Sequence, residues 1–202
     1  MTRRSCYARE VSSLAPTKFT EAEYLALERG SDRKHEFVDG SIVGMAGARP
    51  PHNVIAANLT AALVPLARSR DCVAMTSDQR VHVPSTRLYA YPDLTIACGE
   101  RRYHDDQPPS LLNPTVLVEV TSETTEDFDR GAKFLHYQAI GALREYVIVS
   151  HRERRIDHYR RLDDGQWLLS THSGSARLEI PALGGTIGLD DVYAAVVFGE
   201  GA

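Results

Sequence analysis

Two carboxylates lie in apolar stretches of the sequence, where an unpaired charge is costly. Glu119 is embedded in the run Thr115–Val120, which is typical of a strand covered on both faces. Asp93 follows Pro92 and opens a second apolar run over residues 94–97. If the two strands are neighbours, the acids can meet, and two oxygen donors with water suit Mg²⁺ or Mn²⁺. The residues alone leave a second interpretation open, in which each acid pairs with an arginine or accepts hydrogen bonds from backbone amides.

A lysine follows on the next predicted helix. Lys133 lies at four-residue spacing from Asp129 and Tyr137, beside an expected apolar stripe of Phe128, Ala132, Leu135 and Ala139. In a functional role its ammonium would hold a nucleophilic water or a scissile phosphate. As a surface residue it would only form a helix ion pair with Asp129, worth about 0.3–0.5 kcal/mol.

Three further residues are weaker candidates. Glu36 precedes a predicted hairpin and can add a carboxylate, although such residues are more often solvated. His52 opens a predicted helix, where it caps the helix or contacts an anion. Tyr137 would complete the site from the helix of Lys133. The basic run of Arg152, Arg154, Arg155, Arg160 and Arg161 is more typical of a solvated strand face than of a phosphate contact.

Composition limits the classes of protein. With 202 residues, 43% of them hydrophobic, the chain is long enough for one domain with a sizeable core, and it has no run long enough for a membrane span. The net charge of −4 excludes a strongly basic nucleic-acid-binding chain. No zinc-hydrolase, serine-hydrolase or Walker motif occurs. Three separated cysteines predict no disulfide framework, which fits a cytoplasmic protein.

The pattern of elements predicts an α+β or mixed α/β fold with a mixed sheet flanked by helices. Residues 1–18 have no secretory h-region and are expected to form a disordered lead-in to a single domain at 19–202. Thr20 and Glu23 form a capping box for a helix ending at Gly30, and Asp39-Gly40 predicts a hairpin turn. The remaining predictions are helices at 52–67 and 124–140, and strands at 72–75, 80–83, 88–97, 115–121, 145–150, 155–160, 167–171 and 177–180.

Several of these segments, in this order and spacing, resemble the Uma-two family. This is a large bacterial family of predicted restriction endonucleases with the PD-(D/E)XK nuclease fold. The resemblance runs from about Phe19 to Tyr193. Its segments are Tyr24-Leu25, Glu36–Gly40, His52-Asn53, Pro92-Asp93, Glu119-Val120-Thr121, Asp129–Lys133 and Glu145–Val149.

The resemblance implies a metal site and a mechanism. Asp93, Glu119 and the main-chain carbonyl of Val120 would bind Mg²⁺ or Mn²⁺. The nuclease pattern places a lysine two residues after the second acid, where this chain has Thr121, so Lys133 would be the migrated lysine. The implied activity is hydrolysis of DNA phosphodiester bonds, and fold-level analogy implies a homodimer with two active sites.

Two rival functions stay open. One is a noncatalytic protein that retains the nuclease fold and binds nucleic acid or a partner, which the acidic net charge favours. The other is a different metal-dependent hydrolase on the same fold. The intact set of Asp93, Glu119 and Lys133 favours catalysis over the noncatalytic alternative, and the other hydrolase stays open.

Overall fold

A computed structural model describes residues 18–45, 47, 49–122 and 126–198 of the chain. The lead-in predicted for residues 1–18 therefore lies outside the described residues except for Lys18, and so does the start of the helix predicted from Thr124. The helices are α1 (Glu21–Gly30), α2 (Pro50–Arg68), α3 (Glu126–Arg130), α4 (Ala132–Tyr137) and α5 (Leu189–Val192), with short 3-10 turns at Pro84–Thr86 and Pro181–Leu183.

Twelve strands in three sheets accompany these helices in the described part of the chain. The largest sheet has the order β10-β9-β8-β7-β6-β3, the second β2-β1-β5-β4, and the third pairs β11 with β12. Their bounds are β1 (His35–Val38), β2 (Ser41–Gly44), β3 (Cys72–Thr76), β4 (Val81–Val83), β5 (Leu88–Ala90), β6 (Leu94–Cys98), β7 (Val116–Val120), β8 (Glu145–Val149), β9 (Arg155–Arg161), β10 (Trp167–Ser173), β11 (Arg177–Ile180) and β12 (Gly185–Gly188).

Local sequence signals account for the first elements. Thr20 caps α1, and both hydrogen bonds of the predicted capping box with Glu23 are present. Asp39 and Gly40 turn the chain between β1 and β2 with φ of 42° and 95°, as a tight hairpin turn requires. Both predictions are confirmed.

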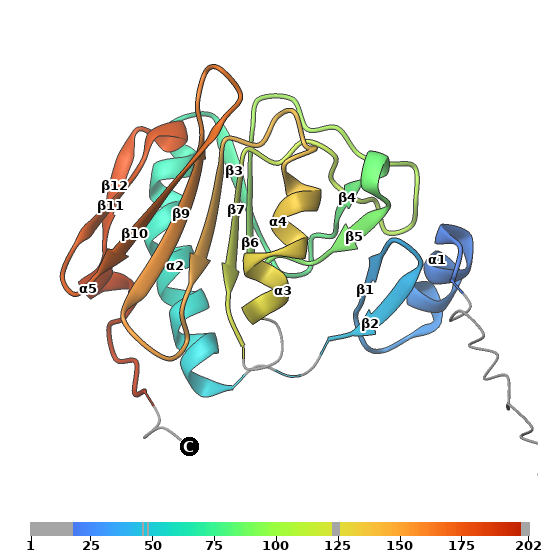
Figure 1. Cartoon of the computed structure of the whole chain (residues 1–202), viewed down its shortest axis with the longest axis horizontal. Coiled ribbons are helices and arrows are strands. Elements are labelled where there is room, and N and C mark those ends of the chain that lie inside the picture. Colours follow the sequence, from blue (N-terminus) through green and yellow to red (C-terminus); the bar gives the residue numbers. More distant parts are fainter. Residues whose placement is uncertain (1–17, 46, 48, 123–125, 199–202) are drawn as a thin grey trace, which may run out of the picture.

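The six-stranded sheet is covered on both faces (Figure 1). On one face, α2 packs with the third sheet and α5 over Val116, Val118 and Val120. On the other face, α4 lies between this sheet and the second sheet, and its core includes Leu117 and Tyr137. The strands β7 and β8 are parallel and are joined through α3 and α4, whereas the other pairs in the sheet are antiparallel. The predicted mixed sheet flanked by helices is confirmed.

Three predicted elements differ from the structure. The strand predicted over 88–97 divides at Tyr91–Asp93, because β5 joins the second sheet and β6 the first. The helix predicted over 124–140 breaks at Gly131 into α3 and α4. The strand predicted over 177–180 pairs with β12 in a separate two-stranded sheet and not with the preceding strand β10. The two strand differences come from pairing between distant segments, and the helix difference comes from the backbone break at Gly131.

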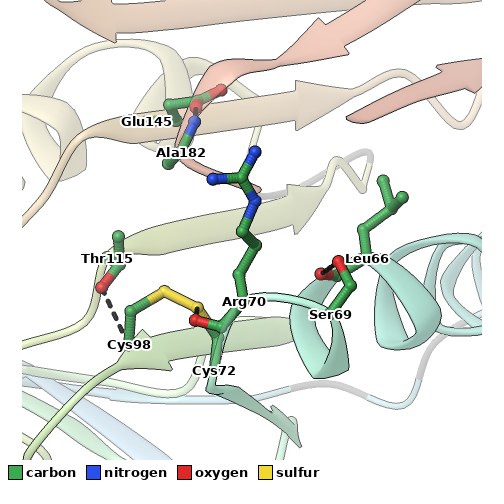
Figure 2. Close-up of a disulfide and its surroundings, with 8 residues drawn as sticks. All are labelled: Leu66, Ser69, Arg70, Cys72, Cys98, Thr115, Glu145 and Ala182. Atoms are coloured by element: carbon green, nitrogen blue, oxygen red, sulfur yellow. Dashed lines mark hydrogen bonds between the residues drawn. A yellow bond between two sulfur atoms is a disulfide. The ribbon is translucent and has the colours of Figure 1, made fainter. Parts of the chain in front are cut away.

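The strand register also pairs two cysteines, contrary to the prediction. Cys72 on β3 lies directly opposite Cys98 on β6, and the two form a disulfide with Cα atoms 4.0 Å apart. Figure 2 shows the bridge, with the backbone amide of Cys98 donating to the hydroxyl of Thr115 at 3.0 Å. Separation in sequence gave no sign of this pairing, because only the register brings the two residues together.

None of the helices in the described residues is long and apolar enough to cross a membrane.

Candidate active site

The register of β6 and β7 brings the two predicted acids to the same level of the sheet. Leu94 pairs with Val118, so Asp93, one residue before β6, lies across from Glu119. The Oδ2 atom of Asp93 accepts a hydrogen bond of 2.7 Å from the backbone amide of Val120. This bond ties the bend before β6 to the end of β7.

Alternation along β7 decides which face Glu119 occupies. Val118 and Val120 point to the face covered by α2, and Leu117 points to the face covered by α4. Glu119 shares the face of Leu117, because successive side chains of a strand alternate. The residue is 4% exposed, and its Oε1 atom accepts hydrogen bonds from Lys133 Nζ at 3.2 Å and from the Tyr137 hydroxyl at 3.0 Å.

Lys133 is the centre of this cluster. Its Nζ atom lies 3.1 Å from Glu36 Oε1, 3.2 Å from Glu119 Oε1 and 3.0 Å from Asp129 Oδ1. Three elements supply these carboxylates, namely β1 of the second sheet, β7 of the first sheet, and α3. The ion pair with Asp129 is the four-residue helix pair that the sequence suggested. The contacts with Glu36 and Glu119 require the tertiary fold.

The position of Lys133 corrects the sequence analysis. The predicted apolar stripe placed it beside buried residues on an accessible flank, but Lys133 is only 3% exposed and Leu135 of that stripe is 68% exposed. Ala132 and Ala139 are exposed as well. The break at Gly131 separates α4 from α3, so a single helical phase across both segments was the wrong basis for choosing the buried face.

Aromatic and main-chain groups fix the carboxylates around Lys133. Tyr137 is fully buried and packs edge-on against Tyr146 at 5.2 Å between ring centroids. The Tyr146 hydroxyl donates to the main-chain carbonyl of Asp129 at 3.0 Å, and the backbone amide of Tyr91 donates to Glu36 Oε1 at 3.2 Å. The cluster is therefore held on several sides by hydrogen bonds from other elements.

Burial and mutual charge shift the pKa values of this cluster. Burial raises the pKa of Glu119 well above its ordinary value, against the opposing effect of Lys133 and with the repulsion of Asp129 and Asp93. Burial acts to lower the pKa of Lys133, but Glu119 and Glu36 raise it well above its ordinary value. Lys133 therefore stays a cation at neutral pH, and the Glu119 carboxyl group, with its raised pKa, holds a proton to higher pH than an ordinary glutamate does.

His52 lies on the other side of Asp93. Its Nε2 atom is 3.3 Å from Asp93 Oδ2. Burial acts to lower the pKa of His52, but Asp93 and the Val120 carbonyl raise it by more. The imidazole thus contacts Asp93, one of the groups that the sequence resemblance assigns to a metal.

The structure brings the predicted site residues together from distant segments. Glu119, Lys133, Tyr137 and Glu36 form one buried cluster, and Asp93 links it to Val120 and His52. Asp129 was considered only as a helix partner, and its buried contact with Lys133 gives it a place in the cluster. Thr121, at the position of the usual nuclease lysine, instead contacts His151 Nδ1 through its hydroxyl at 3.0 Å.

Two further observations complete the description of this region. In the described part of the chain, no group of three or more His, Cys, Asp and Glu side chains is arranged to hold a metal ion. In the basic run, Arg154 pairs with Asp190, and Arg155 pairs with Glu153 and Asp157. These ion pairs agree with the expectation of a strand surface over that of a free phosphate-binding patch.

The mixed six-stranded sheet with helices on both faces has the restriction-endonuclease-like fold. A solved structure from Anabaena variabilis ATCC 29413, described as "a putative nuclease belonging to DUF820", superposes with a TM-score of 0.68. The superposition covers 86% of this chain and 98% of that one, at 14% sequence identity. That likeness supports the fold.

The family follows from sequence comparison. The profile of the Uma2 family, described as "Putative restriction endonuclease", matches residues 21–190, and the chain belongs to this family. Two Synechocystis sp. (strain ATCC 27184 / PCC 6803 / Kazusa) relatives are each 34% identical, the uncharacterized proteins slr1290 and sll1609. The first alignment covers 90% of this chain and 94% of the relative, and the second covers 80% and 92%.

Proposed function

We propose that the protein is a divalent-metal-dependent endonuclease that hydrolyses phosphodiester bonds of DNA. The observation that carries the proposal is the contact of Lys133 with Glu119 in a buried cluster beside Asp93. Membership of a family described as restriction endonucleases supports the same reaction class.

The donor set fits Mg²⁺ or Mn²⁺. Asp93, Glu119 and the carbonyl of Val120 offer oxygen atoms, which these ions prefer. Among the described residues, both hydrogen bonds to Glu119 fall on Oε1, which leaves Oε2 for an ion. The region also carries more negative than positive side chains, since Lys133 and His52 face the carboxylates Asp93, Glu119, Glu36 and Asp129. A dipositive ion would balance this excess.

The chain's own residues have distinct roles in the proposed reaction. A bound divalent ion supplies a water of lowered pKa and neutralises charge on the phosphate. Lys133 is a fixed cation next to Glu119, so it favours hydroxide at that position and stabilises negative charge on the phosphate. Tyr137 and Glu36 hold Glu119 and Lys133 in place. Because Lys133 stays protonated, it acts through its charge and not as a base.

A plasmid-cleavage assay with Mg²⁺ or Mn²⁺ tests the proposal. We expect the wild type to cut and Asp93→Ala not to cut. Asp78→Ala is the matched control, because Asp78 is an exposed carboxylate in an ion pair with Lys34. Equal cleavage by Asp93→Ala would remove Asp93 from the site, and a parallel assay with RNA would show whether DNA is the preferred substrate.

Lys133 gives a sharper prediction for the rate. Lys133→Ala should lower the cleavage rate by about a hundredfold or more, the scale seen on removal of one preorganised electrostatic group. Lys133→Arg should restore the rate only in part, because a planar guanidinium does not replace a compact ammonium. Circular dichroism must first show that each variant is folded, since Lys133 is buried. Equal rates for folded wild type and Lys133→Ala would contradict the assignment.

The second candidate is a noncatalytic protein that binds nucleic acid or a partner. The observation that favours it is the engagement of Lys133 by three carboxylates, which is also the arrangement of a structural ion-pair network. If the wild type cleaves neither DNA nor RNA with any divalent ion tried, this candidate replaces the nuclease.

A further inference from the structure

The strand β10 forms one edge of the six-stranded sheet, next to β9 (Figure 1). Within the described residues, its main chain makes one backbone–backbone hydrogen bond beyond that pairing, the turn bond from the Ala176 amide to the Ser173 carbonyl at 3.3 Å. The amides and carbonyls on the outer side of β10 are therefore open to another strand. The opposite edge strand, β3, has five residues rather than seven, and the Tyr103 hydroxyl lies 4.0 Å from the sulfur of Met75 there.

The sequence of β10 lacks the residues that usually protect an edge strand. Trp167–Ser173 contains no Asp, Glu, Lys or Arg and no proline, which are the residues that most often prevent edge-to-edge pairing. Leu168 and Leu169 are 45% and 50% exposed, and they lie on opposite faces of the sheet because strand side chains alternate. A second strand along this edge would cover apolar side chains on both faces and pair the backbone groups.

The two ends of this edge carry opposite charges. Asp163 and Asp164 lie in the turn before β10, Arg177 begins β11 after it, and all three side chains are exposed. An antiparallel pair of β10 strands related by a twofold axis places the beginning of one strand beside the end of the other. With the axis at Ser170, Asp163 of one copy comes level with Arg177 of the second, since each lies seven residues from Ser170.

We propose that β10 is the interface of a homodimer, in which two copies of the chain pair their β10 strands antiparallel about a twofold axis at Ser170. The partner is a second copy because the edge is complementary to itself, uncharged along the strand and oppositely charged at its ends. A strand pair of this length is a small interface, so the dimer is reversible. The inference is independent of the proposed reaction, since β8 and β9 separate β10 from β7.

Cysteine cross-linking tests the pairing and its register. In a Cys6→Ser background, Ser170→Cys should form a disulfide-linked dimer on mild oxidation, because directly opposite residues have Cα atoms about 4.5–5.5 Å apart. Leu169→Cys is the matched control. In this register it faces Thr171 of the second copy, and the two introduced cysteines lie on a diagonal of about 7–8 Å, too long for a disulfide. Cross-linking of Leu169→Cys without cross-linking of Ser170→Cys would overturn the proposed pairing.

Analytical ultracentrifugation measures the dimer in the unmodified protein. We expect a concentration-dependent monomer–dimer equilibrium in the wild type. Leu169→Lys should raise the dissociation constant of the dimer by about tenfold or more, because it brings two like charges close together across the axis. Leu27→Lys is the control, since Leu27 is a 40% exposed leucine on α1, and it should leave the equilibrium unchanged.

Charge reversal gives a readout that a loss of stability would not imitate. Asp163→Lys and Arg177→Glu should each raise the dissociation constant by about fivefold or more, and the double variant should restore it, because opposite charges then meet again between the copies. Within one chain these two residues lie at opposite ends of β10, so a rescue arises between chains. A wild type that sediments as a monomer at every concentration reached, or a dimer that Leu169→Lys leaves unchanged, would overturn the proposal.

Discussion

Lys133 is surrounded by more negative charge than it carries itself. Glu36, Glu119 and Asp129 all contact its Nζ atom, and all four side chains are nearly inaccessible to solvent. Breaking a buried ion pair by removing one partner is costly, because the remaining charges have no compensation. Lys133 therefore contributes to folding as well as to the proposed chemistry, in contrast to the surface residue expected from the sequence.

Truncation of Lys133 should measure this contribution. Lys133→Ala should reduce the free energy of unfolding by about 3–5 kcal/mol near pH 8. The loss should shrink toward pH 5, because a buried carboxyl group without its cation has a raised pKa, and its protonation stabilises the folded state as pH falls. Urea unfolding at the two pH values measures both effects. Lys18→Ala, which removes an exposed ion pair with Asp39, is the matched control and should change little.

The raised pKa of Glu119 also predicts that metal binding releases protons. In the metal-free protein this carboxyl group holds its proton to higher pH than an ordinary glutamate. A metal ion needs the carboxylate, so binding should release protons and tighten as pH rises. Titration of Mn²⁺ in two buffers of different ionisation enthalpy measures the release. Identical heats in both buffers would show that Glu119 is already ionised or is not a ligand.

At the scale of elements, the second sheet contributes both a site residue and part of the hydrophobic core around α4. Its strand β1 carries Glu36, and its strands β4 and β5 share a hydrophobic core with α4. In β4, His82 is buried, stacks on Tyr89 at 3.8 Å between ring centroids, and has its Nδ1 atom 3.0 Å from the Leu88 carbonyl. Burial lowers the pKa of His82 below its ordinary value of 6.5.

This shift predicts acid sensitivity of the second sheet. A histidine whose folded pKa is lowered contributes stability above the unfolded pKa, and that stability is lost as pH falls through 6.5 toward the folded value. Wild-type protein should therefore unfold at lower urea concentration at pH 5.5 than at pH 7.5. His82→Phe, which keeps a ring against Tyr89, should show a smaller difference between the two pH values. An equal difference in both proteins would assign the acid sensitivity to other groups.

At the scale of the whole molecule, β6 links the site to the disulfide. Asp93 lies immediately before this strand, and Cys98 at its other end is bridged to Cys72 of the edge strand β3. The disulfide closes a loop that includes β4 and β5 of the second sheet. It therefore constrains the unfolded chain around the segment that passes from one sheet to the other.

Reduction of this bridge should lower the stability of the protein. The loop spans a sequence separation of 26, for which chain-entropy arguments give about 3.5 kcal/mol. The melting temperature of the wild type should fall on addition of dithiothreitol. The double variant Cys72→Ser, Cys98→Ser should melt at one temperature with or without it. Cys6→Ser is the control that leaves both bridged cysteines in place, and it should respond as the wild type does.

Structure that depends on only a few neighbouring residues could be predicted from the sequence. The capping box at Thr20 and Glu23 and the turn at Asp39-Gly40 depend on neighbouring backbone groups, so their residue types suffice. A carboxylate in an apolar strand needs a cation or hydrogen bonds to offset its burial, wherever the strand lies in the fold. This requirement is why Glu119 could be singled out from the sequence. The residue pattern also singled out Asp93 and Lys133, and the order of elements predicted the mixed sheet. The resemblance to a known family added the roles of Asp93 as a metal ligand and of Lys133 as the migrated lysine.

Only the tertiary structure decided which distant groups meet. Strand register set Cys72 against Cys98 and Asp93 across from Glu119, and the break at Gly131 determined that Lys133 is buried and Leu135 exposed. The contact of Glu36 with Lys133 depends on two sheets packing against opposite sides of α4. Such contacts depend on register and packing between segments far apart in the chain, and residue types at short spacing carry little information about either.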